Sequence, residues 1–151
     1  MNKAHPLPDE PRYVLLLDSP TEVYRDRLGG STRQRVDSRL AGFLTEATPE
    51  SGLTDEDKFP YPLRQLKDRG GKVRGLGVWC ATEEFDLFVV MALYDKDDER
   101  KYYDAITEFI KDGKEYKEKF ENMSLDTLEK KVEEWSQNDG LMVFTEADMD
   151  G

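Results

Sequence analysis

Residues 62–94, PLRQLKDRGGKVRGLGVWCATEEFDLFVVMALY, decide the fold of this chain. Residues 72–80 and 84–96 each have the apolar, β-branched and aromatic content of a strand, and the short polar turn between them predicts antiparallel neighbours. The second strand is apolar on both alternating sets of positions, which is typical of a central strand covered on both faces. One predicted face carries Phe85, Leu87, Val89, Met91 and Leu93, and the other carries Phe88, Val90, Ala92 and Tyr94.

Upstream of this stretch, the sequence predicts a strand followed by two helices. Residues 12–18 form a short apolar run, and Gly29-Gly30 separates the two helical segments, 19–28 and 31–44. Ser19 precedes Glu22 by three residues, and Ser31 precedes Gln34 by three residues. This is the spacing of a capping box. We therefore expect a helix hairpin, followed by a polar loop over residues 47–60.

Downstream, the pattern predicts further helices and a last strand. Asp97 and Asp98 suit the start of a helix, whose end we expect at Gly113. Ser124 is the expected cap of another helix, which ends at Gly140 and precedes a strand over residues 141–145. The inward face of that helix is predicted to carry Leu125, Leu128, Val132 and Trp135.

The fold class expected from these elements is α+β, with the N-terminal strand and helix hairpin packed on a small antiparallel sheet, and with C-terminal helices. At 151 residues the chain predicts one domain, over residues 12–145. Within it, residues 111–145 form a helical C-terminal extension. We expect residues 1–11 to be loose and residues 146–151 to be a frayed tail.

Charge is distributed unevenly along the chain. Residues 1–80 hold 13 Lys and Arg against 12 Asp and Glu, whereas residues 81–151 hold 9 against 21, and the net charge is −11. Five of the cations fall within residues 64–74. Three interpretations stay open for this basic cluster: a solvated turn, a contact with RNA phosphate, or an ion-pair partner for the acidic half of the chain.

Other motifs favour structural roles. Gly70-Gly71 before Lys72 lacks the spacing of a phosphate-binding P-loop and predicts a tight turn. Cys80 is the only cysteine, so an intramolecular disulfide and a Cys-based metal site are excluded, and a packed thiol is expected. The acids of residues 95–99 fit a helix start better than a calcium loop. No cofactor, metal or membrane partner is predicted, and the expected compartment is the cytoplasm.

The order of elements (strand, helix hairpin, loop, basic turn and strands) resembles the RelE/ParE toxin superfamily, and the HigB-like branch is the most similar. The resemblance spans roughly residues 12–110, whereas residues 111–151 have no counterpart in the minimal toxin fold. The segments that carry it are YVLLLDSPTEVYRDRL (13–28), PLRQLKDRGGKVRGLGVW (62–79) and ALYDKDDERKYYDAI (92–106).

This resemblance implies the toxin of a type II toxin–antitoxin system, an endoribonuclease that cuts free or ribosome-associated mRNA and that a cognate antitoxin neutralises. Such an enzyme uses the 2′-hydroxyl of the RNA as nucleophile and supplies cations that stabilise charge on the scissile phosphate. By position, the implied catalytic residues are Lys72, Arg74 and Tyr94. The implied RNA-binding residues are Arg64, Lys67, Arg69 and Lys96.

Two departures from the toxin pattern leave alternatives open. Asp86 stands where a cation is expected and would repel a phosphate, and the only histidine, His5, is outside the region that resembles the toxins. The alternative function is a catalytically inactive member of the same fold that binds protein or RNA. A third interpretation is an unrelated small interaction domain.

Overall fold

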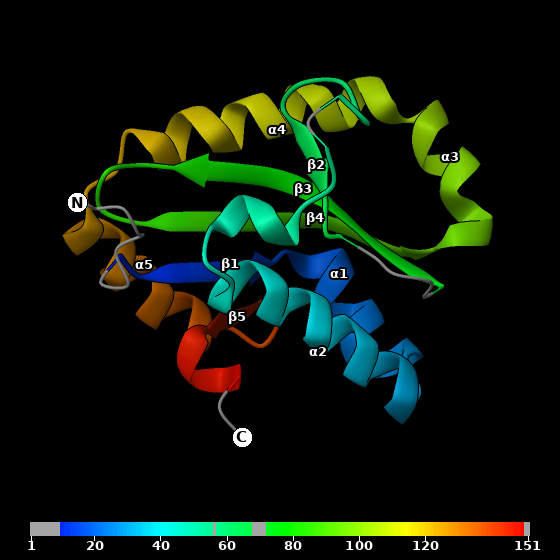
Figure 1. Cartoon of the computed structure of the whole chain (residues 1–151), viewed down its shortest axis with the longest axis horizontal. Helices are drawn as coiled ribbons and strands as arrows, with labels where there is room; N and C mark the ends of the chain where they lie inside the picture. The colour runs from blue at the N-terminus through cyan, green and yellow to red at the C-terminus, as the bar shows by residue number, and fades with distance from the viewer. Residues whose placement is uncertain (1–9, 56, 68–71, 150–151) are drawn as a thin grey trace.

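A five-stranded mixed sheet forms the centre of the protein. The computed structural model describes residues 10–55, 57–67 and 72–149. The strands lie in the order β2-β3-β4-β1-β5 (Figure 1). Their bounds are β1 Arg12–Leu16, β2 Leu63–Gln65, β3 Val73–Ala81, β4 Asp86–Asp95 and β5 Met142–Thr145. The predicted α+β class is confirmed, as is the antiparallel pairing of β3 with β4.

The sheet is not wholly antiparallel, because β1 runs parallel to β4. After β1, the chain forms the helix hairpin and then β2 and β3. β4 follows beside β1 and runs in the same direction as β1. β5 then pairs antiparallel with the other edge of β1. The first strand of the chain therefore lies inside the sheet, between its fourth and fifth strands.

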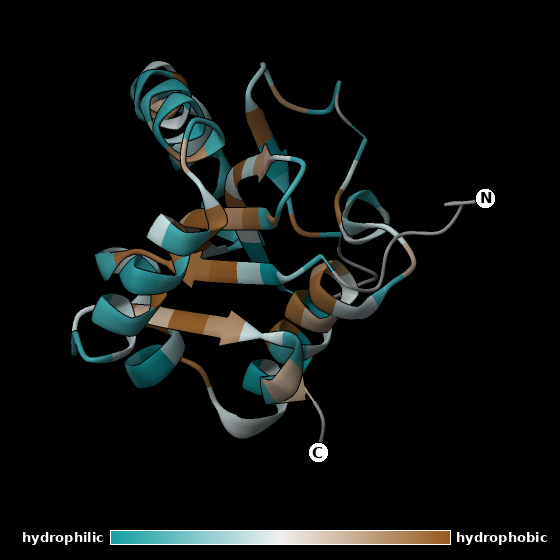
Figure 2. Cartoon of the chain, turned by 90° about the vertical axis from the view of Figure 1, so that its left-hand side faces the viewer, coloured by the Kyte–Doolittle hydropathy of each residue, from teal (hydrophilic) through white to brown (hydrophobic). Residues whose placement is uncertain are grey.

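Helices cover both faces of the sheet. The hairpin consists of α1 Asp18–Glu22, a π-helical turn η1 Val23–Arg27, and α2 Gly30–Thr45. The other face is covered by α4 Ile106–Glu121 and α5 Leu125–Ser136, which follow the short α3 Glu99–Asp104. Figure 1 shows α4 and α2 on opposite sides of the strands, and Figure 2 shows the apolar strands between these helices. Short 3-10 turns complete the chain: η2 Pro49–Gly52, η3 Lys96–Asp98 and η4 Glu146–Met149.

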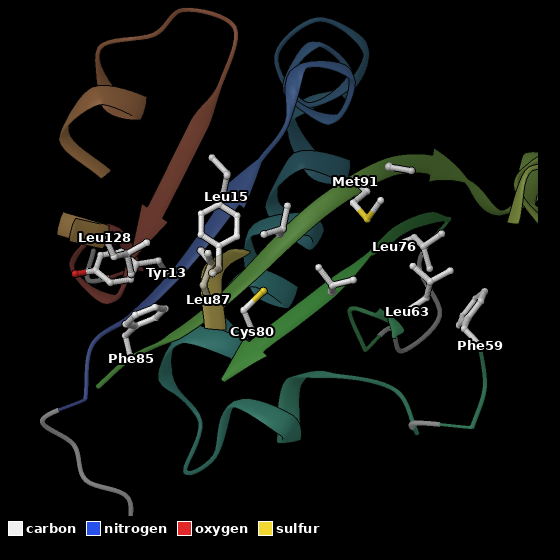
Figure 3. Packing of buried hydrophobic residues seen from close by; sticks show 14 of the residues in the cluster. Tyr13, Leu15, Phe59, Leu63, Leu76, Cys80, Phe85, Leu87, Met91 and Leu128 are labelled. Atoms are coloured by element: carbon white, nitrogen blue, oxygen red, sulfur yellow. The ribbon is translucent and has the colours of Figure 1, made fainter. Parts of the chain in front are cut away.

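Each face of the sheet has its own hydrophobic core. On the α2 side, Phe43 packs on Phe88 with ring centroids 5.6 Å apart. On the α4 and α5 side, Leu15, Leu76 and Leu128 belong to one buried cluster (Figure 3). Burial of apolar area on both faces explains why every residue of β4 but the last is buried, as expected for a central strand.

A β-bulge changes which side chains of β4 share a face. Leu76 pairs with Ala92 and the next residue, Gly77, pairs with Val90, so Met91 is the extra residue of β4. Beyond the bulge, Tyr94 lies in the core cluster of α4, and Leu93 lies in that of α2. The face assignment predicted from strict alternation is therefore wrong for residues 92–94.

Gly113 does not end a helix but lies in the middle of α4, where it is buried. A Cβ atom at this position would approach Cγ1 of Val78 to 2.8 Å and a carbon of Leu63 and of Pro62 to 3.3 Å each. Glycine thus lets α4 approach β2 and β3 closely, and this packing outweighs its poor helix propensity.

Two of the predicted helix starts are also wrong. α1 begins at Asp18 and α2 begins at Gly30, so Ser19 and Ser31 lie inside their helices rather than at the capping position. At the turn after β4, Asp95 accepts a hydrogen bond from the backbone N–H of Asp97 at 2.9 Å. The cap at Ser124 is confirmed, because its hydroxyl accepts from the backbone N–H of Thr127 at 3.2 Å.

The C-terminal extension packs on the sheet. Lys117 Nζ on α4 donates to the carbonyl of Trp79 at 2.7 Å and lies 2.8 Å from Glu121. Glu84, in the β3–β4 turn, accepts from the backbone N–H of Leu125 at the start of α5.

The C-terminal end of the described chain and the loop before β2 contain more structure than predicted. Residues 146–149, expected to be frayed, form η4 because the Asp148 carboxylate accepts from the backbone N–H of Thr145 at 2.7 Å. Within the predicted loop 47–60, η2 packs on α2 because Gly52 has no side chain to hold the two backbones apart. Residues 1–9 and 150–151 lie outside the described residues.

Candidate functional site

Four of the predicted site residues lie at one end of the sheet, where β3 begins and β4 ends. Arg74 lies directly opposite Tyr94 on the paired strands. Just beyond the strands, the backbone N–H of Lys96 donates to the carbonyl of Lys72 at 2.6 Å. We call Lys72, Arg74, Tyr94, Lys96 and the neighbouring Glu99 the sheet-end site.

The two cations at the start of β3 differ in exposure. Lys72 is exposed and precedes the strand, whereas Arg74 is half-buried within it. Residues directly opposite in an antiparallel pair point to the same face. The side chain of Arg74 is therefore on the Tyr94 side of the sheet, toward α3 and α4.

Tyr94 is buried rather than presented to solvent. Its ring stacks on Tyr102 of α3 with centroids 4.1 Å apart, and its hydroxyl accepts a hydrogen bond from Gln65 at 3.3 Å. Burial, followed by the charge of Glu99, raises the pKa of Tyr94 far above its ordinary value of 10.0. The phenol therefore stays protonated at physiological pH, and Tyr102 occupies one face of its ring.

Glu99, which the sequence assigned only to a helix start, is a further member of the site. Its Oε2 atom is buried and, among the described residues, has no hydrogen-bond partner. Its charge raises the pKa values of both Tyr94 and Tyr103, after burial as the larger cause. A buried polar atom without a partner costs about 1–3 kcal/mol. This cost indicates that the Glu99 carboxylate has a role beyond the start of the helix. No pattern in the sequence signalled that role.

A groove of about 340 Å³ lies next to these residues. One wall is formed by the π-helical turn η1 and the start of α2, and includes Arg27 and Thr32; the other includes Lys72, Tyr94 and Tyr102. π-helical turns are rare in proteins and are frequent at functional sites. The groove combines apolar side chains with groups of both charges, as a ligand-binding surface does.

Arg64, predicted to bind RNA, lies in a different environment. Its guanidinium donates to the carbonyl of Thr54 at 2.6 Å, lies 3.2 Å from Glu50 and stands 5.9 Å from the Trp79 ring centroid. These contacts bury Arg64 and tie the 49–55 segment to β2 and β3. The geometry therefore gives Arg64 a structural role.

The remaining predicted residues are dispersed. Lys67 is exposed beside α2, two residues after the end of β2, and its backbone N–H donates to the carbonyl of Gly52 at 2.8 Å. Arg69 and the Gly70-Gly71 turn lie outside the described residues. Asp86, which was expected to oppose phosphate binding, is the first residue of β4 and therefore lies at the opposite end of the strand from Tyr94.

Cys80 is buried between β3 and α4. Burial raises the pKa of the Cys80 thiol to about 12, as expected for a packed cysteine. In the described parts of the chain, no three His, Cys, Asp or Glu side chains cluster closely enough to hold a metal ion. Nor does any described helix have the length and apolar character needed to cross a bilayer.

The chain was compared with protein-family models, curated proteins and solved structures, and none of them matches it. What the protein does must therefore be inferred from its own geometry.

Proposed function

We propose that this protein is a RelE/HigB-like toxin that cleaves mRNA at the sheet-end site and is neutralised by a cognate antitoxin. The observation that carries this proposal is the position of Arg74 opposite Tyr94, with Lys72, Lys96 and Glu99 at the same end of the sheet. The observed order of strand, helix hairpin, short strand and β3–β4 pair also agrees with the order on which the toxin resemblance rests.

The proposed chemistry needs only groups from the protein and the RNA. The 2′-oxygen of the RNA attacks the adjacent phosphorus while the Glu99 carboxylate accepts its proton. Lys72 and Arg74 stabilise the negative charge that develops on the phosphate oxygens. The bond from phosphorus to the 5′-oxygen breaks, and that oxygen leaves with a proton from water. The products are a 2′,3′-cyclic phosphate and a 5′-hydroxyl end.

A second candidate function is RNA binding without cleavage. It is favoured by the environment of Tyr94, whose ring is stacked on Tyr102 and whose pKa is raised. A tyrosine in this state is a poor proton donor and offers little surface for stacking on a base. In this alternative, Lys72 and Arg74 bind phosphate, but no reaction follows.

The test compares the wild type with a Lys72→Ala/Arg74→Ala variant. Growth inhibition in a heterologous host, cleavage of purified RNA and RNA binding are measured for both. The matched control is Lys111→Ala/Lys114→Ala, which removes two exposed lysines from α4. We expect the first variant to lose all three activities while remaining folded, and the control to keep them.

The readouts separate the two candidate functions. Wild-type protein that binds RNA but neither cleaves it nor inhibits growth would favour the binding module. Absence of both binding and cleavage would reject both functions. Full activity in the Lys72→Ala/Arg74→Ala variant would place the site elsewhere on the molecule.

A further inference from the structure

Two tyrosines are the only large hydrophobic side chains that are exposed in the described part of the chain. Tyr61 is 69% exposed and lies in the loop before β2, whereas Tyr103 is 42% exposed and lies on α3. Single exposed apolar side chains are common on protein surfaces and need no explanation. These two are of interest because a third aromatic ring connects them.

Phe59 is the connecting residue. Its ring stacks on that of Tyr103, with centroids 5.5 Å apart and planes 13° from parallel. Phe59 is only 4% exposed and belongs to the core cluster on the α4 side of the sheet (Figure 3), so it supports Tyr103 from within the protein. Because Tyr61 follows two residues later, its Cα atom lies within about 8 Å of that of Phe59. We call Phe59, Tyr61 and Tyr103 the aromatic patch.

The ring of Tyr61 is also supported from one side. The Nζ atom of Lys117 on α4 lies 6.0 Å from the ring centroid. Lys117 is itself held in place, because it donates to the carbonyl of Trp79 at 2.7 Å and lies 2.8 Å from Glu121. A ring that is supported in this way and still open to solvent is pre-organised for stacking, since little conformational freedom is lost on binding.

The aromatic patch begins beside the sheet-end site. Tyr102, the residue before Tyr103, stacks on Tyr94 with centroids 4.1 Å apart. The charge of Glu99 raises the pKa of both Tyr94 and Tyr103, in each case after burial as the larger cause, so both phenol groups lie near this carboxylate. Tyr94 is buried and stacked, whereas Tyr103 is open to solvent. A polymer bound at the sheet-end site would therefore find its first open ring at Tyr103.

We propose that the aromatic patch binds single-stranded RNA through stacking of its bases on Tyr103 and Tyr61. Every nucleobase has a π face, so aromatic side chains bind single strands with little dependence on sequence. RNA is favoured over a protein partner because the patch adjoins the site at which phosphate is proposed to bind. The inference rests on the proposed function, since it takes RNA to be the polymer at the sheet-end site, and it adds a contact with the bases beyond the scissile phosphate.

The test measures binding to the full chain by fluorescence anisotropy with two labelled probes. One is a single-stranded RNA oligonucleotide of mixed sequence, whose 2′-O-methyl groups prevent cleavage. The other has the same sugar–phosphate backbone but no bases. Both probes carry the same phosphate charge, so a difference in affinity comes from the bases. The wild type should bind the base-bearing probe about 5- to 100-fold more tightly, which is the range expected for stacking on aromatic side chains.

Two variants connect that difference with the aromatic patch. Tyr61→Ala/Tyr103→Ala removes both exposed rings and should bind the two probes equally. Tyr61→Phe/Tyr103→Phe is the matched control, because it keeps the rings and loses only the hydroxyl groups, and it should bind as the wild type does. The alanine variant should also keep the wild-type slope of log affinity against log salt concentration, because it removes no phosphate contact.

Two results would overturn the proposal. One is equal affinity of the wild type for the two probes, which would point the exposed rings toward a protein partner. The other is an alanine variant that keeps the full preference for bases. If neither probe binds the wild type, this proposal and the proposed action on RNA both fail. Preference for bases without cleavage of unmodified RNA would support the stacking and reject only the nuclease.

Discussion

The indole N–H of Trp79 donates a hydrogen bond to Asp86 Oδ1 at 2.9 Å, and the pair lies at the start of β4. Tyr94 is eight residues further along the same strand, which corresponds to about 25 Å at the usual strand rise. The acid that stands where a toxin would have a cation is therefore remote from the sheet-end site. The Asp86 carboxylate is also buried within the sheet, so distance and burial both argue against the expected repulsion of a phosphate bound at that site.

Asp86→Asn should stabilise the protein at neutral pH. Burial is the main cause that raises the pKa of Asp86 above its ordinary 3.8, while the Trp79 hydrogen bond acts in the opposite direction. The folded state thus binds the proton more tightly than the unfolded state, and stability falls as the pH rises from 3.8 through the raised value. Asparagine accepts the same hydrogen bond without a charge. Thermal unfolding should give a higher melting temperature for the variant at pH 7, with the difference shrinking toward pH 3; a lower melting temperature at pH 7 would contradict this account.

Glu99→Gln should slow RNA cleavage about 100-fold or more, since removal of a general base typically costs 10²–10⁴ in rate. Binding of RNA should change little, because Lys72 and Arg74 remain. Single-turnover cleavage rates of the wild type and of the variant provide the measurement. Glu108→Gln, an exposed acid on α4, is the control. Wild-type rates in Glu99→Gln would remove Glu99 from the mechanism.

Gly113→Ala should destabilise the protein, although the same change in an exposed helix stabilises by up to about 1 kcal/mol. The added methyl would meet Val78, which is fully buried and cannot move aside. Overpacking of this kind costs about 1–3 kcal/mol. Urea denaturation measures the change, and a higher midpoint for the variant would show that α4 packs less closely on the sheet.

Leu128→Ala should cost more stability than Trp135→Ala. Leu128 is fully buried, and truncation of such a leucine costs about 2–5 kcal/mol. Trp135 is only half-buried and packs edge-on against Phe120 with centroids 5.7 Å apart, so a smaller loss of about 2 kcal/mol is expected. Equal denaturation midpoints for wild type and both variants would show that α5 does not stabilise the domain.

Cys80 should resist alkylation in the folded protein. Burial raises the pKa of its thiol to about 12, and the thiolate is the reactive form. Iodoacetamide at pH 8 should leave the native chain unmodified and should modify it fully in urea, as read by intact mass. Rapid modification without denaturant would mean that α4 opens readily over β3.

Periodicity and residue type identified most of the elements of the fold. The apolar runs of β3 and β4 and the cap at Ser124 follow from local chemistry, and they could be predicted for that reason. The features that were missed depend on contacts between distant segments. The bulge at Met91 depends on the register with β3, and the place of Gly113 within α4 depends on the proximity of Val78.

The site residues also divide into those that the sequence identified and those that only the fold shows. The toxin resemblance implied site roles for Lys72, Arg74, Tyr94 and Lys96, and the structure brings these four residues to one end of the sheet. Glu99 could not be singled out, since only the fold shows that one of its oxygens is buried without a partner among the described residues. The close packing of η2 on α2 depends on Gly52 meeting the backbone of α2, a contact that leaves no local pattern in the sequence.

The position of β1 between β4 and β5 has a consequence for folding during synthesis. Residues 12–16 are made early, but their partner on one side is residues 142–145. At translation rates of about 5–20 residues per second, β1 waits roughly 6–25 seconds for that partner. Until then, one edge of β1 exposes unpaired backbone groups that can associate with other chains. A chain arrested before residue 142 should therefore be prone to aggregation, although it already contains β3 and β4.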